Sequence, residues 1–212
     1  MWIARTASRV ALLSFDQRLV VGLHSGTIDA GGSGWRFGPA VGGAELRRLI
    51  AAFNGGFRFS TGAGRFESYG RVGAPLANGL GSIVTYTDGR TDIGTWHVGV
   101  PAPGMPVASV RQNLTLLIDR GTAAASIDCV SCWGATVGGV VDPARSALGI
   151  TAEGQLVWAG GEHLTPIQLT DALLGARVVR AVEPRFSAPL GARRWRCFVS
   201  PTGPAAPARS RP

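Results

Sequence analysis

The chain of 212 residues contains no lysine, and all 21 of its basic residues are arginine. With 31 glycines and abundant alanine, this bias is typical of a GC-rich, actinobacterial coding sequence. Codon bias is therefore a simpler explanation for the arginines than selection at each position. The sequence also lacks any run of about 18 apolar residues, which excludes a membrane-spanning helix.

Metal ligands are scarce. A zinc site at Cys129 and Cys132 needs two more ligands, and the three histidines, His24, His97 and His163, stand at unrelated spacings. We therefore expect no metal-binding residues, and the sequence does not decide whether the protein needs a metal. A redox motif of the thioredoxin type needs a βαβ context, which the pattern lacks. A loop disulfide and two free thiols both remain open for this C-x-x-C pair, and Cys197 is the third cysteine.

The composition is that of a folded protein with an anionic partner. At 45% hydrophobic residues the chain can build a core as one large domain or two small ones. A net charge of +8 favours phosphate, an acidic envelope polymer or nucleic acid. Because the arginines are scattered and no basic helix or aromatic RNA motif is present, we do not expect nucleic-acid binding.

The apolar pattern predicts an α+β domain with mixed or largely antiparallel sheets and at least two helices. The hairpin around Asp88-Gly89 has a strong turn signal. The helix that begins after Thr165 has a capping residue and an early proline. The expected strands are 10–15, 19–23, 82–86, 91–96, 107–118, 147–151, 155–159 and 178–183; the expected helices are 44–52 and 165–174; residues 28–43 and 57–80 are expected to be loops.

Several polar residues flank the apolar run 114–118. Arg111 and Asn113 precede this run and Asp119 follows it, although a buried strand needs no such residues. Buried polar groups must be paired or functional. Ion pairing across a sheet and a role in binding are equally good explanations for Arg111 and Asp119.

Two further segments add candidates. Asn54, Gly55 and Gly56 follow the helix predicted over 44–52; the glycines suit a helix end, and they also allow a close approach to a ligand. Arg145 leads into a strand of small residues.

Read in order, these segments resemble the phosphodiester glycosidase family with its NAGPA-type domain. The matching stretches are Ala52-Phe53-Asn54-Gly55-Gly56-Phe57, Gly79-Leu80-Gly81-Ser82-Ile83-Val84, Val110-Arg111-Gln112-Asn113-Leu114 and Arg145-Ser146-Ala147-Leu148-Gly149. The resemblance covers about residues 8–199 and is nearest to the actinobacterial envelope branch. It implies one domain over residues 1–200. The residues after it are rich in Pro, Ala, Arg and Ser, which predicts a disordered tail over 201–212.

The resemblance implies hydrolysis of a sugar-1-phosphodiester in cell-envelope or exopolysaccharide metabolism, without a cofactor. Arginine suits bidentate binding of the phosphate, and a carboxyl group serves as acid or nucleophile at the sugar. The implied substrate-binding residues are Asn54, Gly55, Gly56, Arg111, Asn113 and Arg145, and the implied catalytic carboxylates are Asp119 and Glu183.

The last family motif departs from its pattern. Glu183 is present, but Arg185 stands where the family has an aspartate and Ser187 where it has asparagine or glycine. A non-catalytic relative that binds anionic glycans is therefore the alternative. The resemblance also implies an extracytoplasmic location. Because no signal peptide is visible, it further implies a truncated or misassigned N-terminus. The sugar, the oligomeric state and the stereochemical outcome have no signal in the sequence.

Overall fold

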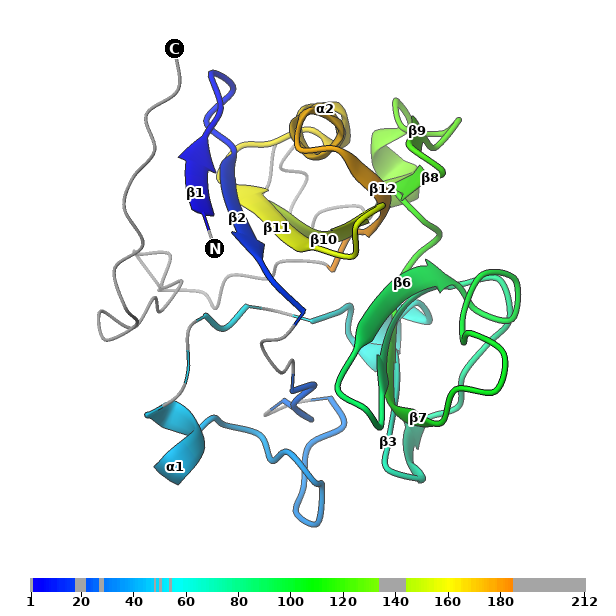
Figure 1. Cartoon of the computed structure of the whole chain (residues 1–212). Helices are drawn as coiled ribbons and strands as arrows, with labels where there is room; N and C mark the ends of the chain where they lie inside the picture. The colour runs from blue at the N-terminus through cyan, green and yellow to red at the C-terminus, as the bar shows by residue number, and fades with distance from the viewer. Residues whose placement is uncertain are drawn as a thin grey trace.

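The structure is a computed structural model, which describes residues 2–17, 22–26, 29–47, 49, 51–53, 55–133 and 144–184. The described residues form two antiparallel sheets and two α-helices in a single domain (Figure 1). The prediction of an α+β fold with largely antiparallel sheets is confirmed. The predicted tail over 201–212 lies outside the described residues.

The larger sheet has seven strands in the order β1-β2-β11-β10-β12-β8-β9. The β10–β11 hairpin and β12 agree with the predicted strands, and β12 ends before Pro184, as a proline requires of a paired strand. Strand β10 is the central strand of this sheet. The bounds are β1 Trp2–Arg5, β2 Ala11–Phe15, β8 Ile118–Asp119, β9 Thr122–Ala123, β10 Arg145–Thr151, β11 Leu156–Gly161 and β12 Val178–Val182.

The smaller sheet has five strands in the order β4-β3-β7-β5-β6, with β7 at its centre. The predicted hairpin turn is confirmed between β5 and β6, where Gly89 adopts a φ of 89° that suits glycine. The bounds are β3 Arg65–Ser68, β4 Arg71–Ala74, β5 Gly81–Tyr86, β6 Thr91–Thr95 and β7 Val107–Gln112.

Helix α2, Pro166–Gly175, covers one face of the seven-stranded sheet (Figure 1). Its first turn forms because the Thr165 hydroxyl accepts from the Gln168 backbone N–H while the Gln168 side chain accepts from the Thr165 N–H. Leu169 and Leu173 then pack on Ala147 and Val157 of the sheet in one buried cluster.

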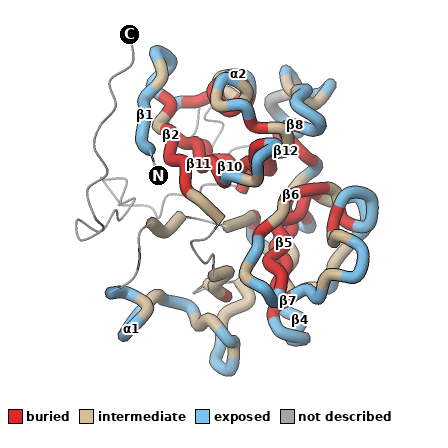
Figure 2. The backbone as a smooth tube through the Cα atoms, viewed as in Figure 1, coloured by how far each residue is buried: buried red, intermediate tan, exposed pale blue. Residues whose placement is uncertain are grey.

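The opposite face of that sheet packs against the five-stranded sheet. Leu148, Trp158 and Val182 from the larger sheet share a buried cluster with Ile83 and Ile93 from the smaller one. Figure 2 shows these strands as buried in both sheets, with exposed turns around them. The order of layers is therefore helix, sheet, sheet.

The predicted hairpin over 10–15 and 19–23 is wrong. Strand β2 pairs with β1 on one edge and with β11 on the other. Both edges are thus occupied, and Gly22 and Leu23 are not in a strand. Residues 18–21 lie outside the described residues.

The predicted helix over 44–52 is largely wrong. Helix α1 comprises only Gly43–Leu46, and Ala51 and Phe53 are not helical. These two residues pack instead on the cluster between the sheets, where the Phe53 ring lies 6.1 Å from that of Trp158 and 6.3 Å from that of Phe15. Long-range packing outweighs helical spacing here.

Two other predictions are corrected. The stretch 57–80 is not a single loop, because it contains the short 3-10 helix η1, Phe59–Thr61, and strands β3 and β4. The strand predicted over 107–118 is divided. Strand β7 ends in the smaller sheet, the chain crosses over, and β8 begins in the larger sheet.

Candidate functional site

Arg111 lies on the central strand β7, opposite Phe66 of β3 and Ile83 of β5. Paired residues of neighbouring strands share a face, so its side chain enters the face that carries Ile83. The residue is 8% exposed. Its Nη2 donates to the Phe57 carbonyl at 2.9 Å, and Cζ lies 5.2 Å and 5.6 Å from the ring centroids of Phe59 and Phe66.

Asn113, two residues further along, fixes the backbone that precedes Phe59. Its Oδ1 accepts from the Phe57 N–H at 3.1 Å, and its Nδ2 donates to the Gly55 carbonyl at 3.4 Å. A Cβ on Gly56 would lie 2.9 Å from that Oδ1 and would overlap the Arg111 side chain. Glycine at position 56 is therefore required by the close approach of this backbone to Arg111 and Asn113.

The charge of Arg111 is not neutralised by an ion pair among the described residues, and its buried Nε has no hydrogen-bond partner among them. Burial lowers the pKa of Arg111 to about 10, and the nearby Asp29 carboxylate opposes this decrease. The guanidinium is thus a buried cation at neutral pH. Transfer of such a charge from water is costly without a counter-charge.

Asp29 is a neighbour of this site that the sequence reading missed. Its Oδ2 accepts from the Phe59 N–H at 3.0 Å, and its charge is felt at Arg111. The available signal was weak: Asp29 is the one acidic residue in the glycine-rich stretch 28–43.

A second buried group forms around Arg145, the first residue of the central strand β10. Its Nη1 donates to Glu183 Oε1 at 2.6 Å and to the Trp133 carbonyl at 2.9 Å, while its Nε donates to the Leu164 carbonyl at 3.0 Å. The Arg145 and Glu183 side chains are 4% and 2% exposed. Arg145 Nη2 and Glu183 Oε2 have no hydrogen-bond partner within the described part of the chain.

The protonation of Glu183 is set by two opposed effects. Burial raises the pKa of Glu183 to about 7, although the Arg145 charge and hydrogen bond act to lower it. Burial is the larger effect because a carboxylate loses most of its hydration at 2% exposure. Burial thus favours the protonated form of Glu183, and the Arg145 charge favours the ionised form.

The predicted site residues fall into two groups. Arg111, Asn113, Gly55 and Gly56 lie together, and Arg145 and Glu183 form an ion pair. No hydrogen bond or ion pair joins the two groups among the described residues. They approach each other where Val182, next to Glu183, lies against Gly81, whose carbonyl accepts from the Asn113 N–H at 2.9 Å.

Asp119, the other predicted site residue that the structure describes, is in neither group. Asp119 is exposed at the end of β8, before the turn at Arg120 and Gly121. Among the described residues, no hydrogen bond or ion pair joins it to Arg111 or Arg145. Asn54 and Arg185 lie outside the described residues. The Trp133 and Leu164 carbonyls, which hold Arg145, were missed because backbone acceptors leave no mark on a sequence.

Neither a metal cluster nor a membrane helix is found in the part of the chain that the structure describes. No three of its His, Cys, Asp and Glu side chains are grouped so that they could hold a metal ion. None of its helices combines the length and the apolar character needed to cross a bilayer.

No protein-family model matches the chain, and a comparison with curated proteins finds no match. The solved structures that it resembles include a glycosidase domain. This is the zebrafish N-acetylglucosamine-1-phosphodiester alpha-N-acetylglucosaminidase catalytic domain, auto-inhibited by its pro-peptide, with 18% identity and a TM-score of 0.45 over 64% of this chain and 50% of that one. A hypothetical protein from Synechocystis has 12% identity and a TM-score of 0.42 over 87% of this chain and 55% of that one. The chain thus spans about half the length of these solved chains, and the resemblance is one of structure alone.

Proposed function

We propose that the protein binds and hydrolyses a sugar-1-phosphodiester, the activity that its sequence motifs imply. The observation that carries the proposal is Arg111, a buried guanidinium without an ion-pair partner among the described residues. A bound phosphodiester anion supplies the missing counter-charge, and arginine suits its geometry. The proposed substrate is an anionic sugar phosphate or envelope glycan, and the proposed location is extracytoplasmic; both follow from the sequence resemblance.

The surroundings of Arg111 suit such a ligand. The rings of Phe59 and Phe66 flank the guanidinium and hold it in a weakly solvated setting, where its attraction to an anion is stronger than in water. Asn113 fixes the Gly55–Phe57 backbone through two hydrogen bonds. The donor is therefore preorganised, which reduces the entropy lost on binding.

Glu183 is the proposed general acid. With a pKa raised to about 7, it holds a proton near neutral pH and can donate it to the oxygen that leaves the sugar C1 atom. Because phosphate is already a good leaving group, this proton contributes less than in an ordinary glycosidase.

A second candidate function is binding without hydrolysis. The observation that favours it is the 2% exposure of the Glu183 side chain together with its ion pair to Arg145. A carboxyl group in this state cannot touch a substrate. In this alternative the protein recognises an anionic glycan through Arg111 alone.

The experiment is release of N-acetylglucosamine from UDP-N-acetylglucosamine, compared between the wild type and Arg111→Ala. We expect release by the wild type and its loss in the variant. Arg111→Lys keeps the charge but not the planar fork, and we expect intermediate activity from it. Arg90→Ala is the matched control, because Arg90 is an exposed arginine whose partner is Asp88 on a hairpin turn; its activity should be unchanged.

Calorimetric titration with the same nucleotide sugar separates the two candidates. Binding that depends on Arg111 without release supports the non-catalytic alternative. Equal binding or release by the wild type and Arg111→Ala, with Arg111→Ala folded by circular dichroism, rejects the assigned role of Arg111 and with it the proposal.

A further inference from the structure

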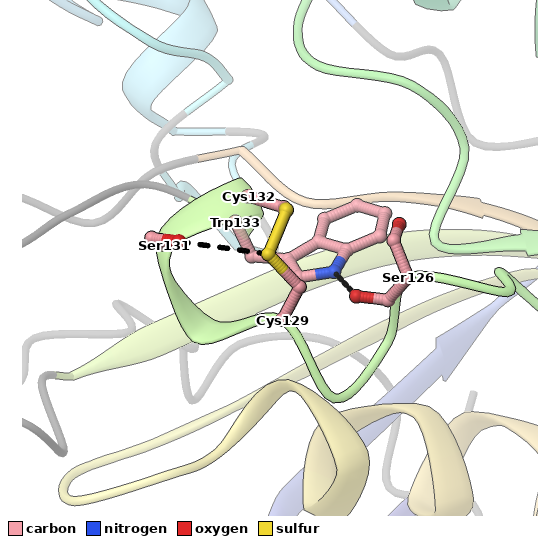
Figure 3. Close-up of a disulfide and its surroundings, with 5 residues drawn as sticks. All are labelled: Ser126, Cys129, Ser131, Cys132 and Trp133. Carbon is pink, nitrogen blue, oxygen red and sulfur yellow. Dashed lines mark hydrogen bonds between the residues drawn. A yellow bond between two sulfur atoms is a disulfide. The ribbon is translucent and has the colours of Figure 1, made fainter.

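A disulfide lies at the surface beside the Arg145–Glu183 pair. Cys129 and Cys132 are joined with their Cα atoms 5.3 Å apart, in the turn that contains the 3-10 helix η2, Val130–Trp133 (Figure 3). Cys132 is exposed and Cys129 is half-buried. A thiol reductant in solution can therefore reach the bond, because thiol–disulfide exchange requires access to a sulfur atom.

The same turn contacts the buried ion pair directly. Trp133 follows Cys132 and is 2% exposed. Its indole Nε1 donates to the Ser126 carbonyl at 2.8 Å, as Figure 3 shows. Its own carbonyl accepts from Arg145 Nη1, the atom that also binds Glu183. Trp133 and Arg145 thus connect the disulfide to the proposed general acid.

The disulfide constrains only this turn. Its cysteines are three residues apart, and the turn between them is closed by a hydrogen bond from the Cys132 N–H to the Cys129 carbonyl at 2.9 Å. A crosslink over so short a loop removes little entropy from the unfolded chain compared with one that joins distant segments. Reduction is therefore expected to loosen the turn and to leave the sheets intact.

We propose that the Cys129–Cys132 disulfide is a redox-controlled cover over the Arg145–Glu183 pair. In the oxidised form the Trp133 carbonyl is held against Arg145, and the turn excludes substrate from the pair. Reduction by a dithiol transfers two electrons and two protons to the bond, gives two protein thiols and converts the dithiol to its own disulfide. Trp133 then leaves Arg145, and Glu183 becomes accessible. A carboxyl that is 2% exposed reaches a substrate in this way, and in that respect the cover rests on the proposed function.

The first test needs no substrate. Acrylamide quenching of tryptophan fluorescence is measured with and without dithiothreitol in a Cys197→Ser background, which removes the third thiol. Subtraction of the Trp133→Phe variant isolates the Trp133 contribution. We expect a several-fold increase in its quenching on reduction. In parallel, amide hydrogen exchange should accelerate over residues 124–133 and stay slow over α2.

Unchanged Trp133 quenching after complete reduction, with thiol formation verified by mass spectrometry, overturns the proposal. A global rise in exchange that includes α2 overturns it as well, because the disulfide is then a general stabiliser of the fold. The Cys129→Ser/Cys132→Ser double variant should behave like the reduced protein and should not respond to dithiothreitol.

The second test is activity on UDP-N-acetylglucosamine in both redox states. We expect several-fold faster release by the reduced protein and by the double variant. If Trp133 opens and the rates of the two states are equal, the turn does not control the site, and the cover is rejected. If Trp133 opens and neither state has activity, the proposed hydrolysis fails while the redox-controlled cover stands on its fluorescence and exchange results.

Discussion

Arg145 and Glu183 form an ion pair of 2.6 Å between side chains that are 4% and 2% exposed. Removal of one partner from such a pair leaves an uncompensated buried charge and costs about 3–5 kcal/mol. The pair occupies the start of the central strand of one sheet, and Arg111 occupies the central strand of the other. Each sheet therefore carries a guanidinium in its interior, and of these two only Arg145 forms an ion pair within the described residues.

The stability of the fold should decrease as the pH rises from 4.5 to 7 through Glu183. Its folded pKa of about 7 exceeds the ordinary value of 4.5, so the folded state binds the proton more tightly than the unfolded state. The stabilisation is complete below pH 4.5 and is lost as the pH approaches 7. The difference in unfolding free energy between the wild type and Glu183→Gln should change by about 3 kcal/mol over this interval.

Urea unfolding at a series of pH values measures this difference. Glu153→Gln is the control, because the pKa of exposed Glu153 is lowered by hydrogen bonds and its loss leaves the Glu183 contribution in place. If the unfolding free energies of the wild type and of Glu183→Gln change in parallel with pH, Glu183 keeps an ordinary pKa in the folded protein.

Gly56→Ala should destabilise the protein by about 1–3 kcal/mol, because the new methyl group overlaps the Arg111 side chain and Asn113 Oδ1. Gly55→Ala is the matched control. A Cβ at position 55 meets no atom within 4 Å, so its effect should stay within about 0.5 kcal/mol. Chemical denaturation of both variants gives the comparison, and equal effects would contradict the close approach.

Asn113→Ala should cost about 1–3 kcal/mol, because it leaves the buried Phe57 N–H without its acceptor. It should also weaken anion binding, because the Gly55–Phe57 backbone is no longer held beside Arg111. Asn78→Ala, at an exposed asparagine, serves as the comparison for both unfolding and calorimetric titration. Retention of wild-type stability by Asn113→Ala would count against this structural role.

Thr165→Ala should destabilise α2 by about 1 kcal/mol through loss of the cap on the Gln168 N–H. Thr165→Ser keeps the hydroxyl and should retain most of the stability. Thermal unfolding followed by far-ultraviolet circular dichroism measures both variants. If serine and alanine have the same effect, the hydroxyl makes no contribution.

Local sequence signals predicted those elements whose cause is local. The Asp88-Gly89 turn and the Thr165 cap each follow from residues within a few positions of one another. The pairing of β2 has no local cause. Its edges are occupied by β1 and β11, and no pattern within residues 10–23 predicts these partners. Phe53 likewise leaves its helical pattern for contacts with Phe15 and Trp158, both distant in the sequence.

The same distinction between local and long-range causes applies to the candidate site. The motif residues Arg111 and Asn113 were identified because polar groups beside an apolar run are unusual. The pairing of Arg145 with Glu183 joins positions 38 residues apart, and residue types alone could not decide which arginine would be neutralised. The role of Trp133 depends on its carbonyl, which every residue possesses.

The charge of Arg111, which has no ion-pair partner among the described residues, connects anion concentration to the folding equilibrium. A ligand that binds only the folded chain raises its unfolding free energy by RT ln(1 + [L]/Kd), about 2.7 kcal/mol at a hundredfold excess over Kd. The melting temperature of the wild type should therefore rank anions by affinity, and Arg111→Ala should lose the ranking. Melting temperatures measured with different anions can therefore identify candidate substrates before any hydrolysis has been measured.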